Sequence, residues 1–510
     1  MLRKFNLMPG RVSALAMGAV FGGVLFIGQG TAHAAGPSTA TLEAEIRQLQ
    51  SQIQQLQARQ DFSQAQASQA QATANAAAAA TKSTPAAAGG QVVTFNKANG
   101  LRLGNVNVKV GGYIAAEGVY RTKSMGADMD NRYTSIPLPG SAASREHELR
   151  GSARQTRLSL GISTKPDSVT TISGYVESDF MGAAPTSNSK QSNSYIPRLR
   201  QAWAGYERSD FGLHVFGGQM WSLATAEKKT LDPGSEAGPA VIDNSNVVGF
   251  TYARQPGFRL VKDFGPRWWA AVSVENPQGV GSSTIAGNGN LSGVTPTNET
   301  APDVIAKVAT DTSIGQFALF GLVNFFHNQT TGAPQHNNNL VGGGVGASAV
   351  TNVVPKYLDL QANVLWGEGT GRYGSANLSD VVVGGLNAAG NQSWGALRNL
   401  QAMVGLVGHP TPVLDVYGYA GTEYLYADGA NGYGPGRAAA GGQVHHVDEG
   451  TVGFWWKFYQ GQMGLMQTGL QYAYLRQSNF AAGAAGVTTG PAIHASDNTM
   501  MVSLRYYPFQ

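Results

Sequence analysis

Three arginines lie on the polar faces of two predicted β-strands. Arg157 lies opposite the alternating apolar residues Leu158 and Leu160, and Arg198 and Arg200 share one face of a later segment. Side chains two residues apart in a strand point to the same side of a sheet, so arginines of adjacent segments can stack across one wall. Guanidinium groups stay charged and bind carboxylates through paired hydrogen bonds. The pattern predicts a cationic strip that could attract anions.

Carboxylates are predicted on the same face. Glu177 and Asp179 fall on the polar side of a neighbouring segment. Two interpretations stay open and can hold together: the arginines pair with these carboxylates and brace the wall, or unpaired arginines select a solute. Arg154 is close to Arg157 but off its alternation, so a bulge or a strand start is needed to place it there. Further charges expected on this interior are Glu275, Lys307, Asp359 and Arg372.

These charged residues can share one face only if they lie on a sheet with one polar and one apolar face. The sequence after residue 100 predicts such a sheet. Segments of about ten residues alternate between apolar and polar side chains, as in a barrel with a lipid-facing exterior and a polar lumen. A β-sandwich alternates too, but about 420 residues exceed one sandwich several times over. Further segments that we predict as strands lie at 197–207, 247–254, 268–276, 303–310, 317–323, 357–365, 413–426, 451–459, 463–477 and 499–509.

The fold class predicted is therefore all-β, a transmembrane antiparallel β-barrel of about 16 strands. That number allots about 26 residues to each strand with its connection, which suits short turns at one end and long loops at the other. No later apolar run approaches the roughly 18 residues of a spanning helix, which excludes a helical inner-membrane protein. Long loops outside the cell are expected at 125–144, 279–301, 330–339 and 427–447.

An α-helical coiled-coil extension is predicted before the barrel. Residues 1–34 read as a signal peptide, with basic residues, an apolar run and a cleavage site after Ala34; a membrane anchor is the alternative. Residues 35–74 carry a heptad seam of Leu and Ile from Leu42 to Leu56, so we expect a periplasmic coiled coil, or else one amphipathic helix lying on its own barrel. Residues 75–100 form an Ala/Gly/Pro linker, and the barrel spans 101–510.

Composition narrows the function. The chain has no cysteine, which excludes disulfides, a thiol enzyme and a cysteine-ligated metal site. Charged residues make up 13% of the chain, below the roughly 25% of soluble domains, which suits a surface that faces lipid. Of the net charge of +4, the signal peptide carries three positive side chains. We therefore expect no nucleic-acid partner.

Catalytic motifs are absent or weak. The sequence contains no G-x-S-x-G, H-E-x-x-H or P-loop motif, although a barrel lipase could use a Ser and a His that sequence alone does not pair. His445 and His446 with Asp448 and Glu449 could bind a metal, or form a solvated loop. We expect no enzyme, no metal and no cofactor. A structural tether that uses the coiled coil is a further alternative.

Several motifs together resemble the DcaP-like family of outer-membrane porins. They are KVGGYIAAEGVY, GSARQTRLSL, PRLRQAWAGY followed by GGQMWS, VSVENP and GEGTGRY, spread over residues 40–509. The resemblance implies a homotrimer of 16-stranded barrels with a periplasmic coiled coil, admitting small anions such as dicarboxylates. Arg154 and Arg157 match the family's S-A-R-Q-x-R motif, and Arg198 and Arg200 its R-L-R motif, which implies that these four arginines line the pore.

Two features of the chain differ from what the resemblance and the usual pattern of barrel proteins would lead us to expect. The Ile and Leu order of the heptad seam favours two helices, whereas the resemblance implies three subunits, and we follow the resemblance. Gln510 follows the closing aromatic Phe509, and Pro508 interrupts the last strand, which could weaken recognition by the barrel-insertion machinery.

The sequence thus predicts a passive, anion-preferring channel in the outer membrane of a Gram-negative bacterium. Lipid and lipopolysaccharide surround it, and small anionic solutes are its partners. The candidate pore residues are Arg154, Arg157, Glu177, Asp179, Arg198, Arg200, Lys307 and Arg372.

Overall fold

The chain divides into two units, Met1–Gly90 and Gln91–Gln510, in a computed structural model. The structure describes residues 50, 57, 68, 93–96, 100–182, 195–283, 299–329, 337–386, 392–437, 442–484 and 487–508. The predicted signal peptide, nearly all of the predicted coiled coil and most of the linker lie outside the described residues. Only the second unit is described below.

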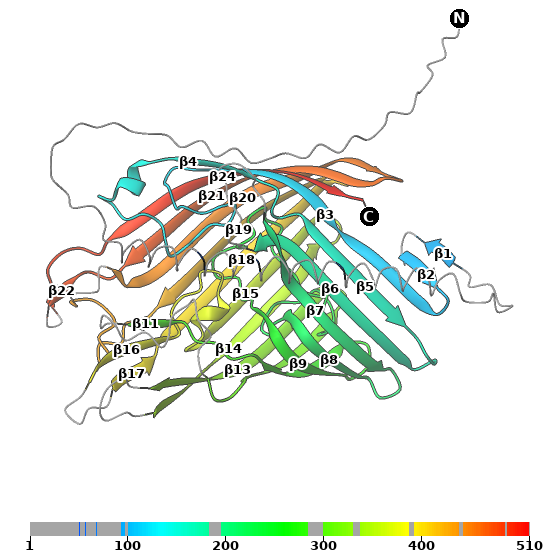
Figure 1. Ribbon diagram of the computed structural model, residues 1–510, viewed down its shortest axis with the longest axis horizontal. Coiled ribbons are helices and arrows are strands. Elements are labelled where there is room, and N and C mark those ends of the chain that lie inside the picture. Colours follow the sequence, from blue (N-terminus) through cyan, green and yellow to red (C-terminus); the bar gives the residue numbers. More distant parts are fainter. Residues whose placement is uncertain are drawn as a thin grey trace, which may run out of the picture. The chain divides into compact units, whose positions relative to one another are not determined.

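The second unit is a closed antiparallel β-barrel (Figure 1). Its main sheet has 19 strands, of which β1 and β2 form an appended hairpin, and β4 and β5 share one position in the wall, which leaves a barrel of 16. The predicted fold class is confirmed for this part of the chain. The strands are β1 (Val93–Asn96), β2 (Gly100–Leu103), β3 (Val106–Arg121), β4 (Glu148–Ser152), β5 (Arg157–Thr164), β6 (Thr170–Gly182), β7 (Ile196–Arg208), β8 (Leu213–Trp221), β9 (Arg254–Asp263), β10 (Trp268–Glu275), β11 (Gly281–Ser283), β12 (Asp303–Thr312), β13 (Gly315–Gln329), β14 (Asn337–Val354), β15 (Leu358–Glu368), β16 (Val381–Leu386), β17 (Gln392–Ala396), β18 (Arg398–Thr411), β19 (Leu414–Leu425), β20 (Val444–Gly461), β21 (Gly464–Asn479), β22 (Gly483–Ala484), β23 (Val487–Thr488) and β24 (His494–Tyr507).

The barrel closes where β24 pairs with β3, through contacts such as Thr499 with Arg121. On its other side β3 pairs with β4 near one end and with β5 near the other. Residues 153–156 form a turn between β4 and β5, in which the Thr156 N–H donates to the Ala153 carbonyl. This interruption is the reason why Arg154 is off the alternation of Arg157.

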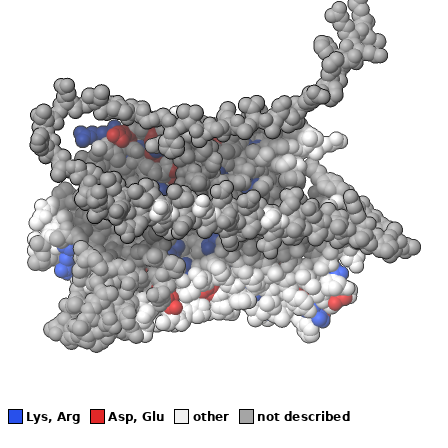
Figure 2. Space-filling model, viewed as in Figure 1, with Lys and Arg blue, Asp and Glu red and all other residues white. Residues whose placement is uncertain are grey.

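The outer face of the wall is apolar and its inner face is polar. On β5 the outward Leu158, Leu160 and Ile162 are 45–50% exposed, whereas Glu177 and Asp179 on β6 are buried inside the barrel. Figure 2 shows that the described surface in one view is mostly uncharged. This division is what a membrane-spanning barrel requires. In the described residues we find no helix long and apolar enough to cross a membrane.

Short turns and long loops alternate along the chain, so all short turns lie at one end of the antiparallel barrel. The long connections are 122–147, 183–195, 222–253, 276–302, 330–336, 369–397, 426–443 and 480–493. Two of the predicted loops extend too far, because β14 already begins at Asn337 and β20 at Val444. The loops carry two 3-10 helices, η1 (Ala142–Arg145) and η2 (Gly371–Tyr373), and a small sheet of β11, β16 and β17.

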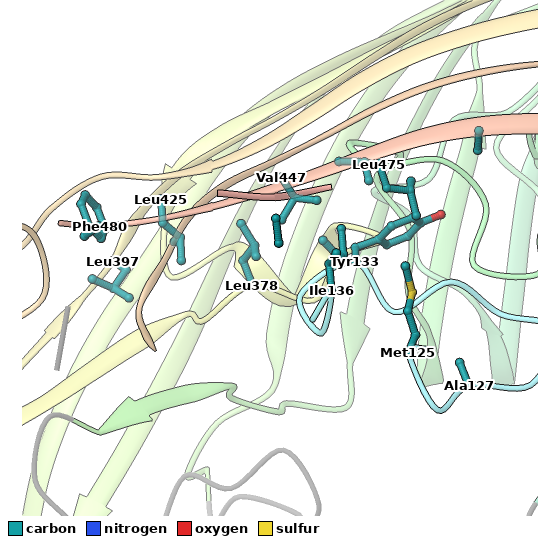
Figure 3. Close-up of a cluster of buried hydrophobic side chains, with 14 of the residues drawn as sticks. Met125, Ala127, Tyr133, Ile136, Leu378, Leu397, Leu425, Val447, Leu475 and Phe480 are labelled. Atoms are coloured by element: carbon teal, nitrogen blue, oxygen red, sulfur yellow. The ribbon is translucent and has the colours of Figure 1, made fainter. Parts of the chain in front are cut away.

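The loops at this end pack together over a buried apolar cluster. Met125 and Tyr133 of the connection 122–147 belong to one cluster with Leu378 of the connection 369–397, and the cluster continues onto Val447 and Leu475 of the wall (Figure 3). Apolar contact of this kind holds long loops in place, although these loops contain only short helical turns and strands.

The prediction of a strand at 247–254 is wrong. Residues 247–253 belong to a 32-residue connection, 222–253, and only Arg254 starts a strand, β9. Gly249 has a φ of 82°, which breaks an extended chain, and Val247, Val248 and Phe250 are fully buried. We call residues 222–253 the inner loop, because its side chains pack against inward-facing residues of the barrel wall, such as Tyr417 and Trp455.

Candidate functional site

A cavity of about 570 Å³ lies between the inner loop and one side of the barrel wall. The wall contributes residues of β3, β5, β6, β7, β8, β9 and β24, and the inner loop contributes residues between Thr225 and Tyr252. Cationic side chains outnumber acidic ones among the residues that line it. The cations are Arg157, Arg200, Lys228, Arg254 and Arg505, and the acids are Glu177, Glu236 and Asp243.

The early arginines and carboxylates form a ladder across the wall. Arg157 pairs in register with Asp179, and Asp179 pairs in register with Arg198. Arg198 donates to both oxygens of Asp179, at 3.0 Å from Nε and 2.7 Å from Nη2. Arg200 donates to Glu177 at 2.6 Å and to Asp179 at 2.8 Å. The bracing interpretation therefore describes Arg198 and Arg200, whose charges are largely balanced.

Of the three ladder arginines, Arg157 has the weakest contact with a carboxylate. Its closest acidic contact is from Nε to Glu177, at 3.9 Å, which is too long for a hydrogen bond. The same Nε is buried and donates no hydrogen bond among the described residues. The guanidinium carbon of Arg157 lies 5.3 Å from the centre of the Tyr113 ring. Arg157 thus keeps hydrogen-bonding capacity for a solute in the cavity.

Arg254 is a cavity residue that sequence reasoning missed. Within the described part of the chain, its Nε and Nη1 are buried without a hydrogen-bond partner. Strand alternation alone would group Arg254 with the outward Phe258 and Leu260. Arg254 is the first residue of β9, directly after the inner loop, and it lines the cavity although the alternation of β9 does not predict this.

Arg505 is the second cationic residue that sequence reasoning missed, although it lies in the predicted closing strand. It donates to Glu117 from Nε at 3.1 Å and from Nη2 at 2.8 Å, and to Gln155 at 3.2 Å. Its guanidinium lies between the rings of Tyr113 and Trp455, at 4.9 and 4.7 Å. Alternation along β24 would have placed it inside, next to β3, once barrel closure was assumed.

The remaining predicted residues lie away from the lining of this cavity. Arg154 pairs with Asp128 of the connection 122–147 and donates to the carbonyls of Phe180 and Met181 near the end of β6, so it holds this connection to the wall. Lys307 is fully buried and binds Glu227 together with the carbonyls of Leu223 and Thr225, at the start of the inner loop. Arg372 lies on η2, where it pairs with Asp303 and donates to Gln255.

The inner loop is fixed to the wall by carboxylates that accept its backbone N–H groups. The Val248 N–H donates to Glu449 at 2.8 Å, and the Gly249 N–H donates to Glu423 at 2.9 Å. Buried backbone donors need such partners, since an unpaired one costs about 1–3 kcal/mol. This attachment keeps the loop on one side of the lumen and leaves the cavity on the other.

Two acidic residues of the inner loop have raised pKa values. Burial raises the pKa of Asp243 to about 7, against hydrogen bonds from the Ser245 and Asn131 N–H groups. Burial also raises the pKa of Glu236 to about 7. A raised pKa means that the neutral form predominates below about pH 7, so both residues lose negative charge as the pH falls. The excess of positive charge in the cavity then grows.

No group of three or more potential metal ligands is found among the described residues. In this part of the chain, His446 instead stacks on Tyr424 and lies 3.5 Å from Asp448.

No protein-family model matches this sequence, and no curated protein sequence is similar to it. The fold is similar to that of the outer membrane channel DcaP of Acinetobacter baumannii, with a TM-score of 0.58, 18% identity, and coverage of 81% of this chain and 99% of that chain. The chain has the fold of a DcaP-like channel. An anion-selective porin from Comamonas acidovorans also matches, with a TM-score of 0.43, 12% identity, and coverage of 79% of this chain and 99% of that chain. The DcaP comparison confirms, for the fold, the resemblance noted in the sequence.

Proposed function

We propose that this protein is an outer-membrane porin for the passive diffusion of small anionic solutes, including dicarboxylates. The observation that carries the proposal is the set of five cationic side chains around one cavity of the barrel, opposed by three acidic ones. Arg157 and Arg254 matter most, because their buried guanidinium nitrogens retain unused hydrogen-bond donors. A fixed positive potential in a narrow lumen raises the local concentration of anions.

Other charged residues hold the surrounding wall and the inner loop in place. Asp179 and Glu177 hold Arg198 and Arg200 at fixed places on the wall, while Lys307 holds the base of the inner loop. A dicarboxylate can engage one arginine with each carboxylate, and charge-assisted hydrogen bonds to guanidinium groups are strong. The gradient of the solute supplies the driving force, and no cofactor is needed.

The setting of the channel is part of the proposal. We place the barrel in the outer membrane of a Gram-negative bacterium, as a homotrimer, with residues 35–74 as a periplasmic coiled coil. The apolar outer face supports the membrane location. In this orientation the long loops face the outside of the cell and the short turns face the periplasm.

Uptake into proteoliposomes tests the proposal with three solutes of equal chain length. Succinate is a dianion, 1,4-butanediol is neutral, and 1,4-diaminobutane is a dication. We expect succinate to enter faster than 1,4-diaminobutane, and we expect the double variant Arg157→Gln with Arg254→Gln to remove this preference while the diol rate is kept. Faster entry of the dication would overturn the proposal.

A further inference from the structure

Aromatic side chains share the cavity with the unpaired arginine of β9. Trp221 ends β8 and pairs in register with Arg254, whose guanidinium carbon lies 5.3 Å from the centre of the Trp221 ring. Tyr252 lies next to Trp221, with ring centres 5.4 Å apart. All three residues line the cavity. A cation with free donors thus lies beside a nearly continuous aromatic surface.

The two rings are held from behind and remain accessible from the cavity. Phe250 is fully buried and stacks on Tyr252 at 5.8 Å with an angle of 20° between the ring planes. Trp221 and Tyr252 themselves are only partly buried. The backbone of Tyr252 is fixed by a hydrogen bond of its N–H to the Tyr373 carbonyl, at 2.7 Å. Phe250 thus borders the cavity but is fully buried and supports Tyr252, whereas the partly buried Trp221 and Tyr252 present ring surface to the cavity.

The unpaired guanidinium donors of Arg254 favour an anionic ligand group. The rings of Trp221 and Tyr252 favour a flat apolar group attached to that anion. Among the described residues, the buried Nε and Nη1 of Arg254 have no hydrogen-bond partner. Leaving such donors unpaired is costly, which favours a ligand that supplies acceptor oxygens. Aromatic rings add about 0.5–1.5 kcal/mol per pair beyond the burial of area, which corresponds to about 2- to 13-fold in affinity.

We propose that Arg254, Trp221 and Tyr252 form a binding site for aromatic carboxylates within the pore. The carboxylate accepts hydrogen bonds from the Arg254 guanidinium, and the ring lies against Trp221 and Tyr252. This inference rests on the proposed porin function and deepens it. It predicts that the channel distinguishes anions of equal charge and similar size by whether their ring is aromatic.

Two probes isolate the contribution of the ring. Benzoate and cyclohexanecarboxylate carry the same charge and the same number of ring carbons, but only benzoate is flat and aromatic. The measurement is the concentration of each that halves the chloride conductance of the full chain in planar bilayers. For the native chain we expect the value for benzoate to be lower than that for cyclohexanecarboxylate by about 2- to 13-fold.

Variants locate the site. We expect Trp221→Leu to bring the two probes to equal values and Trp221→Phe to keep most of the preference. Trp268→Leu is the matched control, because Trp268 is 57% exposed on the outer face and should leave the preference unchanged. Heat-modifiable migration of each variant on denaturing gels verifies that its barrel has folded, and Tyr252→Leu replaces any variant that fails this check.

The outcomes separate the inference from the proposed function. Equal values for the two probes in a native channel that still prefers chloride over potassium would overturn the aromatic site and leave the porin standing. A preference for benzoate that survives in both Trp221→Leu and Tyr252→Leu would also overturn the site. A native channel without chloride preference would overturn both the site and the proposed function.

Discussion

Replacing Arg254 by glutamine should reduce chloride selectivity more than any substitution of equal charge away from the cavity. A cavity of 570 Å³ has a radius of about 5 Å if it is treated as a sphere, so an ion at its centre lies about 5 Å from the lining. At that distance one unit charge contributes about 0.8 kcal/mol in water and about 3 kcal/mol at an effective dielectric constant of 20. We take about 1 kcal/mol for a wet lumen. Removing the charge disfavours chloride and favours potassium by this amount each, so the ratio of chloride to potassium permeability should fall by about 30-fold.

The assay is the zero-current potential across a planar bilayer under a KCl gradient, for the native chain and for two variants. Arg398→Gln is the matched control, because it removes the same charge from a guanidinium that is half exposed and paired with Glu368 at 3.0 Å. We expect Arg398→Gln to change the permeability ratio by less than about 1.5-fold, since exposed ion pairs are weak and screened. Equal effects of the two substitutions would refute the assignment of Arg254 to the permeation path.

Three further predictions concern the balance of charge and the inner loop. Asp179→Asn should raise chloride selectivity, since Arg198 and Arg200 then lose a balancing carboxylate; an unchanged or lower zero-current potential in the folded variant would contradict this. Chloride selectivity should fall as the pH rises from 5.5 to 8.5, because burial raises the pKa of Asp243 to about 7 and this residue therefore ionises in that range. In Asp243→Asn, the zero-current potential should change less with pH than in the native chain. Gly249→Ala should detach the inner loop, because a Cβ there would lie 2.0 Å from a backbone oxygen. We expect this variant to show noisier single-channel currents. Gly238→Ala is the control and should behave as the native chain does, because a Cβ at Gly238 would lie in open space.

The barrel could be predicted from the sequence because strand alternation is set locally. Leu158, Leu160 and Ile162 face outward as the pattern required, and the polar face carries Glu177 and Asp179. The same local rule placed the arginine and carboxylate strip correctly, since pairing across adjacent strands follows from register. Whether the charge of an arginine is neutralised by a carboxylate depends on differences of one or two ångströms between side chains. The sequence does not determine these distances.

The inner loop could not be predicted, because its conformation depends on contacts between distant parts of the chain. Val248 and Gly249 have their N–H groups bound by Glu449 and Glu423, some 200 and 170 residues further along. An apolar segment that packs inside a barrel resembles a strand in composition, which is why residues 247–254 were misassigned. Arg254 was missed for the same reason, because it directly follows this loop and lies in the cavity lining against the alternation of β9.

The most direct test of the account is the zero-current potential of the purified native chain under a tenfold KCl gradient at pH 7. The account predicts a potential whose sign corresponds to chloride crossing more easily than potassium, because cationic side chains outnumber acidic ones around the cavity. A potential of the opposite sign, from a folded and conducting barrel, would contradict the claim that these arginines select the solute.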